Sequence, residues 1–358
     1  MSPPVLIIAE AGVNHDGSLA DALRMIDVAA AAGADVVKFQ TFDATQLVTG
    51  RAGKAAYQAR NTGADDGQLA MLKALELDRD AHRTLAAHAE ARGVRFMSTA
   101  FDLDSLDFLA GLDMPAVKIP SGDLTWGPML LRAARLGRPL IVSTGMATLE
   151  EIGEALKVIA FGLTREGTPA SAADREAAFA DPAAQALLRD RVTLLHCTTE
   201  YPAPLTAVNL RAMDVMRESF GLPVGYSDHT LGITVAIAAV ARGATVIEKH
   251  FTLDRTRTGP DHAASLEPDE LAAMVTAIRE VETALGAARK APAAEEIGNR
   301  AIARRSLVAA GPIAVGERFS LDNLTAKRPA DGLSPMEIWP LLGQPSPRAY
   351  AADEAIEP

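Results

Sequence analysis

The sequence predicts an α/β fold, a closed (β/α)8 barrel followed by a small C-terminal β-type domain. Short runs rich in Val, Ile and Leu alternate with amphipathic Ala/Leu/Glu/Arg stretches, as in a parallel sheet whose strands are joined by helices. Eight such runs occur, which is the number that closes a barrel of this type. The 358 residues exceed the roughly 250 of one such barrel by enough for a second, small domain.

Each predicted strand is a short apolar run that ends in polar residues. Two of the connecting helices are predicted at 22–35 and 236–245, where a Gly ends the helix and the next strand begins almost at once. Because these tight turns lie at one end of the barrel, we expect the longer excursions 41–70 and 199–223 at the other end, as lids or substrate loops. The predicted strands are 5–10, 35–40, 94–99, 116–121, 139–144, 192–198, 224–229 and 245–250.

The composition of the chain changes after residue 286. Residues 288–300 are rich in Ala, Pro and charged side chains, which predicts a linker between a barrel domain, 1–287, and a second domain, 301–358. In 304–335, short apolar pieces are separated by Gly and Pro, and none is long enough for another barrel repeat. We therefore expect a small, loop-rich domain that would be marginally stable alone.

Charge and hydropathy exclude several classes of partner. Lys and Arg number 35 and Asp and Glu 46, so the net charge is -11, which argues against nucleic acid or an anionic membrane as a partner. No stretch approaches the roughly 18 uninterrupted apolar residues of a membrane span, and the N-terminal segment lacks the pattern of a secretion signal. We expect a soluble, cytoplasmic protein. Cys197, the only cysteine, is expected to be a buried small hydrophobic residue.

Two histidines at the ends of successive predicted strands predict a divalent metal in the barrel mouth. They are His229 in GYSDHT and His250 in IEKHF, and the neighbouring Asp228 and Glu248 are oxygen donors or hydrogen-bonding partners for such a site. Imidazole suits zinc, iron, cobalt or manganese. A Lewis-acid metal fits better than a structural zinc, which needs a closed set of ligands, usually thiolates. Either histidine alone would be better interpreted as a hydrogen-bonded barrel residue.

The other strand ends are also unusually polar. Active sites of parallel barrels lie at the carboxyl ends of the strands. Burial of a full ring of polar groups there costs desolvation free energy, which indicates that the groups have a function. The ring contains Glu10, Lys38, Thr99, Lys118, Ser121, Ser143, Thr144, His196, Thr198, Thr199, Ser227, Asp228, His229, Glu248, Lys249 and His250.

Two lysines in this ring predict an anion site. Lys38 and Lys118, with nearby hydroxyls and Gly-containing turns, suit a phosphate ester that also carries a carboxylate. Glu10 and Glu248 are candidate general acid and base groups. A buried lysine could instead form a Schiff base, as in class I aldolases, although the metal ligands argue against it. The segment GVNHDG lacks the central Gly of a dinucleotide fingerprint, so no organic cofactor is expected.

Eight motifs together resemble the sialic acid (nonulosonic acid) synthase family. Its bacterial members condense phosphoenolpyruvate with an N-acetylated mannose-type sugar. The resemblance covers nearly the whole chain and implies a TIM barrel followed by an antifreeze-like (SAF) domain of the β-clip type. The motifs are EAGVNHDG, VKFQTF, KIPSGD, VSTGMA, HCTTEYPAP, GYSDHT, IEKHFT and GPDH.

The resemblance also implies roles for individual residues. It implies that His229 and His250 hold Mn²⁺, with Mg²⁺ or Co²⁺ as alternatives, and that the enzyme is a homodimer with swapped C-terminal domains. Arg304 or Arg305 of the partner chain, here predicted to be Arg305, would reach the N-acetyl group. The residues expected around phosphoenolpyruvate are Lys38, Thr99, Lys118, Ser121, Ser143 and Ser227. Those expected near the sugar and the reacting atoms are Glu10, Thr199, Tyr201, Glu248 and Asp261.

Loop residues set the expected branch of the family. Thr199, Glu200 and His262 depart from the neuraminate-forming pattern and are similar to the legionaminic acid branch, whose sugar is 2,4-diacetamido and 6-deoxy. The expected activity is therefore that of a carbon–carbon bond-forming transferase that makes N,N'-diacetyllegionaminic acid. Alternatives are an N-acetylneuraminate or pseudaminic acid synthase, a synthase acting on a sugar phosphate, and a catalytically silent sugar-binding protein. A second phosphate would need extra basic residues, which 201–210 does not supply.

Overall fold

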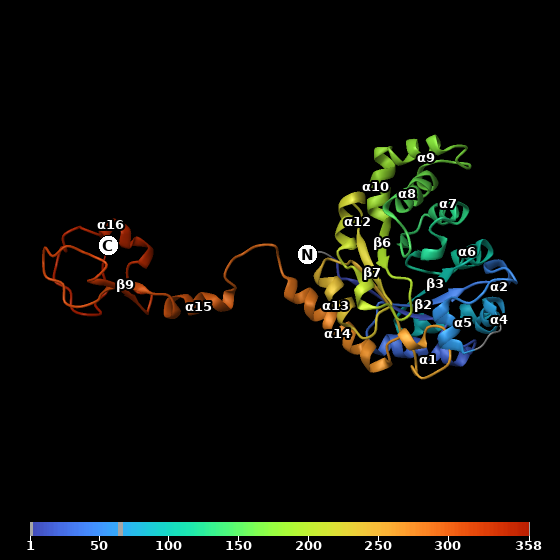
Figure 1. Cartoon of the computed structure of the whole chain (residues 1–358), viewed down its shortest axis with the longest axis horizontal. Helices are drawn as coiled ribbons and strands as arrows, with labels where there is room; N and C mark the ends of the chain where they lie inside the picture. Colours follow the sequence, from blue (N-terminus) through green and yellow to red (C-terminus); the bar gives the residue numbers. More distant parts are fainter. Residues whose placement is uncertain (1–2, 64–66, 358) are drawn as a thin grey trace. The chain divides into compact units, whose positions relative to one another are not determined.

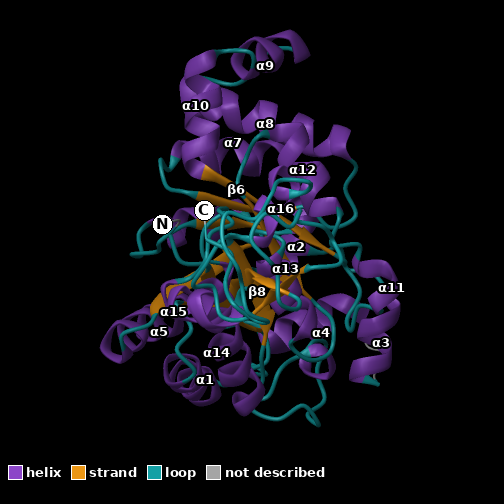
Figure 2. Ribbon diagram, turned by 90° about the vertical axis from the view of Figure 1, so that its left-hand side faces the viewer, coloured by secondary structure: helices purple, strands orange, loops and turns teal. Residues whose placement is uncertain are grey.

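Eight parallel strands close into a barrel in the N-terminal part of the chain. The structure, a computed structural model, describes residues 3–63 and 67–357. The chain divides into two compact units, residues 1–286 and 287–358. In the first unit the strands pair in chain order and the last pairs with the first, which confirms the predicted barrel. Helices lie outside the strands of this unit (Figures 1 and 2).

All eight predicted strands are present, with small shifts of their ends. The fourth ends before Pro120, because proline has no N–H to offer a neighbouring strand. Parallel pairing places Glu10 level with both Lys38 and His250, and Ser227 level with Glu248. The strands are β1 (Leu6–Gly12), β2 (Val36–Thr41), β3 (Arg95–Ala100), β4 (Val117–Ile119), β5 (Leu140–Ser143), β6 (Val192–Cys197), β7 (Val224–Asp228) and β8 (Val246–His250).

The helices between strands bury one apolar face each. In α1 (Leu19–Ala31) the buried residues Ala22, Met25, Ile26 and Ala29 follow helical spacing, and the Ser18 hydroxyl caps the first turn. The predicted helix 22–35 therefore ends earlier than expected, before Gly33 with its φ of 79°. The other barrel helices are α5 (Arg79–Arg92), α6 (Leu103–Ala110), α7 (Gly127–Arg135), α8 (Leu149–Thr164), α9 (Ala172–Phe179), α10 (Pro182–Arg191), α12 (Ala212–Phe220), α13 (Thr234–Ala241) and α14 (Pro268–Leu285).

The two long excursions contain short helices. In the excursion 41–70, α2 (Ala44–Leu47) and α3 (Ala56–Thr62) precede α4 (Gly67–Leu75), and its residues 64–66 lie outside the described part of the chain. The excursion 199–223 contains α11 (Leu205–Val208) before α12. Short 3₁₀ turns follow β4 and β8, at Ser121–Asp123 (η1) and His262–Ala264 (η2).

Apolar packing forms a large barrel core and a smaller cluster. Tyr226, Phe39 and Phe251 are among the largest fully buried side chains of the barrel. The smaller group, called here the mouth cluster, is separate from that core and consists of the buried residues Val13, Phe42, Ala44, Met71 and Leu75. No helix in the described residues is both long and apolar enough to span a bilayer.

The second unit has a small core of its own. An antiparallel pair, β9 (Ser306–Ala309) and β10 (Leu324–Lys327), is its only two-stranded sheet among the described residues. The segment interpreted as a linker, 288–300, is helical from Ala294, where α15 (Ala294–Ala303) begins. A 3₁₀ turn η3 (Pro335–Glu337) and α16 (Ile338–Leu341) complete the unit. Its core consists of Leu307, Ala309, Ile313, Phe319, Leu324, Tyr350 and Ile356.

Candidate active site

Four buried charged side chains meet at the carboxyl ends of the strands. Lys38 Nζ lies 2.6 Å from Glu10 Oε2 and 3.5 Å from Glu248 Oε2, and Lys118 Nζ lies 3.4 Å from Glu248 Oε1. None of the four is more than 5% exposed. Burial of charge is costly unless each group is paired, and here two cations face two carboxylates. With both carboxyl groups ionised the cluster is neutral, and it offers two ammonium groups to an incoming anion.

The two carboxylates of this cluster differ strongly in pKa. Burial raises the pKa of Glu10 to about 7, although Lys38 opposes the shift. Burial acts in the same direction on Glu248, but the ammonium groups of Lys118 and Lys38 outweigh it and hold its pKa well below the ordinary value. Glu10 can therefore exchange a proton near neutral pH, whereas Glu248 stays ionised. Carboxyl pairs with separated pKa values are typical of acid–base chemistry.

The two histidines are neutral and lie close together. Burial lowers the pKa of His229 to about 4 and that of His250 well below its ordinary value. His229 Nδ1 donates to the Thr198 carbonyl oxygen at 2.6 Å, which assigns the tautomer and leaves Nε2 as the electron-pair donor. The ring centroids of His229 and His250 are 5.6 Å apart, and His250 Nδ1 has no hydrogen-bond partner among the described residues.

The donor set fits a divalent metal with open coordination positions. Within 3–63 and 67–357, no group of three or more His, Cys, Asp or Glu side chains is assembled to hold a metal. The protein alone thus offers two imidazoles, and a metal bound to them would take its other ligands from substrate or water. Open positions are the mark of a catalytic metal rather than a structural one.

Hydroxyl groups surround the lysines. Thr99 Oγ1 accepts from Lys38 Nζ at 3.0 Å, and Ser227 Oγ donates to Glu248 Oε1 at 2.8 Å. Ser121 Oγ accepts from the Gly145 N–H at 2.9 Å. A side chain at Gly145 would place its Cβ 2.4 Å from Thr199 Oγ1, so this turn requires glycine.

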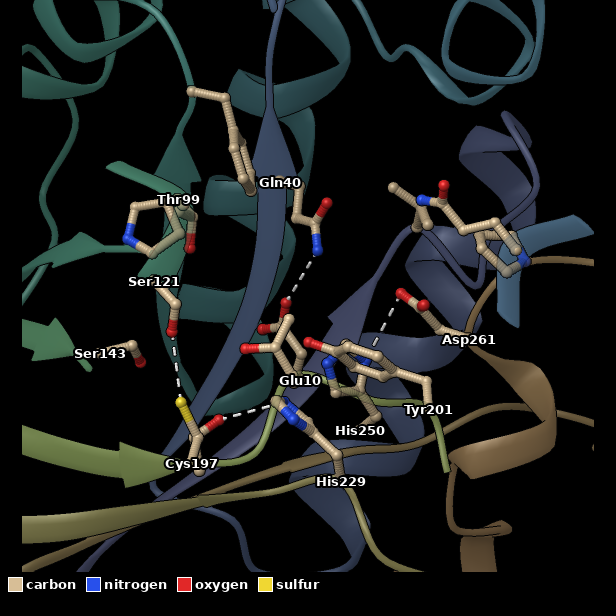
Figure 3. A pocket seen from close by; sticks show the side chains of 18 of the residues that line it. Glu10, Gln40, Thr99, Ser121, Ser143, Cys197, Tyr201, His229, His250 and Asp261 are labelled. Atoms are coloured by element: carbon tan, nitrogen blue, oxygen red, sulfur yellow. Dashed lines mark hydrogen bonds and ion pairs between the residues drawn. The ribbon is translucent and has the colours of Figure 1, made fainter. Parts of the chain in front are cut away.

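One cavity of about 490 Å³ contains most of the predicted site. Glu10, Tyr201, His229 and His250 point toward one another in it (Figure 3). Arg305 belongs to the second unit, where it is exposed and donates to the Ala326 carbonyl oxygen at 3.3 Å. The predicted residues that line the cavity are Glu10, Lys38, Thr99, Lys118, Ser121, Ser143, Thr199, Tyr201, Ser227, His229, Glu248, His250 and Asp261.

Other residues of the predicted polar ring do not line this cavity. Asp228, interpreted as a neighbour of the metal, instead pairs with Lys249 at 2.9 Å, because alternate residues of a strand face opposite sides of the barrel. Thr144 and His196 bond to backbone carbonyl oxygens. His262, which is not part of that ring, was expected to mark the sugar pocket, but it is buried and contacts Thr252 and Asp16.

The excursion 41–70, predicted as a lid or substrate loop, does contribute to the cavity, but its individual lining side chains were not predicted from the sequence. The Tyr57 ring of α3 lies beside the Tyr201 ring, with centroids 5.0 Å apart and planes tilted by 32°, and the Tyr201 and His229 ring centroids are 4.1 Å apart. The amphipathic sequence GQLAMLKAL of α4 was the signal for a helix here, because its apolar residues recur at helical spacing. The lining residues not predicted individually include Gln40 of β2 and, after that strand, Leu47, Val48, Tyr57, Gln58, Gln68, Met71, Leu72 and Leu75.

Comparison with known proteins places the chain among synthases of nine-carbon acids. The NeuB family model matches residues 25–290, and the SAF domain model matches 304–358. The chain is 48% identical over 351 residues to N,N'-diacetyllegionaminic acid synthase of Campylobacter jejuni subsp. jejuni, with 98% of this chain and 98% of that protein covered. Identity to the Legionella pneumophila protein of the same name is 44%, over 94% of this chain and 89% of that protein.

Solved structures agree in fold. The N-acetylneuraminic acid (sialic acid) synthetase from Leptospira borgpetersenii, in complex with citrate, superposes with a TM-score of 0.67 at 32% identity. That match covers 83% of this chain and 90% of the other. The spore coat polysaccharide biosynthesis protein SpsE of Bacillus subtilis gives a TM-score of 0.62 at 32% identity, over 99% of this chain and 94% of the other.

Proposed function

The chain belongs to the NeuB family, and from this premise we propose that it condenses phosphoenolpyruvate with an N-acetylated mannose-type aminosugar. The products would be a nine-carbon nonulosonic acid, N,N'-diacetyllegionaminic acid, and inorganic phosphate. The two relatives at 48% and 44% identity, both named for that acid, support the choice of product. The single observation that carries the chemistry is the cavity that combines two lysines, two carboxyl groups of different pKa and two neutral histidines.

Phosphoenolpyruvate would bind at the lysines. Its phosphate and carboxylate need positive charge and hydroxyl donors, which Lys38 and Lys118 offer together with Thr99, Ser121 and Ser143, and Ser227 adds a further hydroxyl. Glu248 holds both lysines in place and remains anionic. Thr199 contributes a buried hydroxyl without a hydrogen-bond partner among the described residues, which suits contact with a polar substrate group.

The histidines would hold a divalent metal, with Mn²⁺ the first candidate and Mg²⁺ or Co²⁺ as alternatives. When bound, the metal supplies a Lewis acid for the aldehyde oxygen of the open-chain sugar. The protein's own part is to fix the imidazoles, through the Thr198 carbonyl oxygen on His229 and the Tyr201 ring, which lies beside both His229 and His250. Asp261 Oδ2 lies 3.8 Å from His250 Nδ1 and faces the same cavity.

The proposed reaction joins C3 of phosphoenolpyruvate to the aldehyde carbon of the sugar. The aldehyde oxygen becomes the new hydroxyl and takes up one proton. Water then adds to C2, and Glu10, whose pKa is about 7, accepts the proton that the water releases, so the two proton transfers balance. The resulting phosphorylated tetrahedral intermediate loses inorganic phosphate by C–O cleavage, while Lys38 and Lys118 balance the charge of the leaving group. Phosphoenolpyruvate, sugar and one water thus give the acid and phosphate. Because phosphoenolpyruvate is an intracellular metabolite, we place this activity in the cytoplasm.

We further propose a homodimer in which the second unit of one chain completes the site of its partner. Arg304 and Arg305 are exposed, and Arg305 has one long hydrogen bond, so either is available to an acetamido group. Mixing inactive His229→Ala chains with inactive Arg305→Ala chains should restore activity, because mixed dimers would contain one intact site. Demonstrated subunit exchange without recovered activity would reject the shared site.

Phosphate release from three sugars tests the proposed function. The full chain is mixed with phosphoenolpyruvate, Mn²⁺ and 2,4-diacetamido-2,4,6-trideoxymannose, N-acetylmannosamine or N-acetylmannosamine 6-phosphate. We expect the highest kcat/KM with the diacetamido sugar, because a polar pocket left unpaired by the wrong sugar rejects it. A higher value with N-acetylmannosamine would make the chain a neuraminate synthase, and no release with any sugar would reject the proposal.

A further inference from the structure

One wall of the active-site cavity is apolar. It consists of Val13, Leu47, Val48, Met71, Leu72 and Leu75, and is called the apolar wall below. Three of these residues, Val13, Met71 and Leu75, belong to the mouth cluster, which is separate from the barrel core. The apolar wall is therefore the cavity-facing side of an independent hydrophobic cluster.

Short helices of the β2–α5 excursion hold this wall in place. Met71, Leu72 and Leu75 lie on one face of α4 by their spacing. The Ala44 N–H at the start of α2 donates to Glu76 Oε1 at 2.6 Å, which ties α2 to the end of α4. Asp43 caps α2 through the Thr45 N–H. The wall is thus preformed and does not need a ligand to assemble it.

Amide groups lie beside the apolar wall. Gln68 and Leu72 are one turn apart on α4, so their side chains are neighbours, and both line the cavity. Gln58 of α3 also lines the cavity, with its Oε1 at 3.5 Å from Gln68 Nε2. An apolar surface bordered by amides suits a substituent that carries a methyl group rather than a hydroxyl.

We propose that the apolar wall is the subsite for a methyl group of the sugar and that Leu72 is a specificity-determining residue. This inference rests on the proposed function. A hydroxyl placed against Leu72, Met71 and Leu75 would leave water and find no donor or acceptor on those three side chains, whereas a methyl group gives up no hydrogen bond there. The methyl group can come from the deoxy carbon C6 or from an acetamido group, since both present the same chemistry to the wall.

Sugars hydroxylated at one methyl group at a time test the inference. The analogues of 2,4-diacetamido-2,4,6-trideoxymannose carry an added hydroxyl at C6, on the C2 acetamido methyl, or on the C4 acetamido methyl. We expect one analogue to lose kcat/KM roughly ten- to hundredfold with the wild-type enzyme, the range for a hydrophobic pocket and a single small group. The affected position identifies the source of the methyl group.

Variants of α4 then test whether the apolar wall causes the loss of kcat/KM with the hydroxylated sugar. Leu72→Gln should reduce the preference for the methyl sugar by about tenfold or more and leave the KM of phosphoenolpyruvate unchanged. Leu69→Gln is the matched control, because Leu69 is half-buried on the same helix and packs on the mouth cluster but does not line the cavity. Leu72→Ala, a milder change, should lower kcat/KM for the methyl sugar without improving the hydroxylated one.

The outcomes separate this inference from the function on which it rests. If all sugars release phosphate but none of the added hydroxyls matters, or if Leu69→Gln changes the preference as much as Leu72→Gln, the methyl subsite is wrong and the synthase activity stands. If no sugar releases phosphate from phosphoenolpyruvate, both the proposed function and the proposed methyl subsite are wrong.

Discussion

The ion pair between Asp228 and Lys249 should be a large, measurable contribution to the stability of the barrel. Both side chains are completely buried, with Lys249 Nζ 2.9 Å from Asp228 Oδ2 and 2.5 Å from the Thr230 carbonyl oxygen. The pair joins β7 to β8 behind the site, one residue away from each of His229 and His250. The perturbation is Lys249→Met, which removes the charged end group and keeps an unbranched apolar side chain one heavy atom shorter.

The expected loss follows from the geometry. At 2.9 Å and an effective dielectric constant of about 20, the attraction between the charges is about 6 kcal/mol. Desolvation of both groups offsets much of this in the intact protein, but Lys249→Met leaves the Asp228 carboxylate buried without a counter-charge. Breaking one side of such a pair costs about 3–5 kcal/mol, a large part of the roughly 5–15 kcal/mol that stabilises a domain.

Urea unfolding followed by tryptophan fluorescence can measure this loss in the barrel alone. The chain has two tryptophans, Trp126 in the first unit and Trp339 in the second, so a Trp339→Phe background reports only on the barrel. The double variant Asp228→Asn/Lys249→Met should recover most of the loss, because it removes both charges.

A partly exposed group of ion pairs supplies the control. Lys157 Nζ is also 2.9 Å from Glu154 Oε1 and pairs with Glu176 as well, but the side chains are 23%, 54% and 61% exposed, so Lys157→Met leaves hydrated carboxylates and should cost less than about 1 kcal/mol. If Lys249→Met costs no more than Lys157→Met, or if the double variant is no more stable than the single one, the reasoning about the buried pair is wrong.

Three further predictions concern the active site. His229→Ala and His250→Ala should unfold at urea concentrations close to that of the wild type but lose activity, and treatment of the wild type with a chelator should cause the same loss of activity. Full turnover in excess chelator without added metal would contradict the role of a metal. Lys118→Ala should raise the KM of phosphoenolpyruvate about tenfold or more and change that of the sugar little, and steady-state kinetics with an unchanged phosphoenolpyruvate KM would refute the anion site. Burial raises the pKa of Glu10 from 4.5 to about 7, so the folded state holds a proton that the unfolded state releases above pH 4.5. The contribution of this proton to the free energy of unfolding is full below pH 4.5 and is lost as the pH rises to about 7. In urea unfolding, the wild type should therefore lose about 3 kcal/mol more than Glu10→Gln between pH 4.5 and 8, and parallel pH profiles of the two proteins would contradict this prediction.

The sequence was sufficient to predict the barrel and the centre of its site. Buried parallel strands read as continuous Val, Ile and Leu runs, and the polar residue that ends each run marks the functional end of a barrel. Glu10, Lys38, Lys118, His229 and His250 could be placed together on this basis, and the structure brings them into one cavity.

Two features could not be predicted in the same way. Successive side chains of a strand point alternately into the barrel and away from it, so a residue's side depends on the register of its strand, which the sequence does not give. Asp228 and Lys249 were therefore grouped with cavity residues, although they pair with each other outside the cavity. The apolar wall depends on how α2 and α4 fold back over the mouth, through contacts such as that of Glu76 with Ala44, which are distant in sequence. Hydrophobic periodicity predicts a helix in α4 but not what its apolar face covers.

The carbon skeleton of the product is the most direct test of the proposed activity. The full chain is incubated with Mn²⁺, 2,4-diacetamido-2,4,6-trideoxymannose and phosphoenolpyruvate labelled with ¹³C at C3, and the products are followed by NMR and mass spectrometry. We expect a new bond from the labelled carbon to the former aldehyde carbon of the sugar, with one phosphate released for each nine-carbon acid formed. Labelled pyruvate released with phosphate, or a phosphorylated sugar, would show hydrolysis or phosphoryl transfer and would contradict a condensing enzyme.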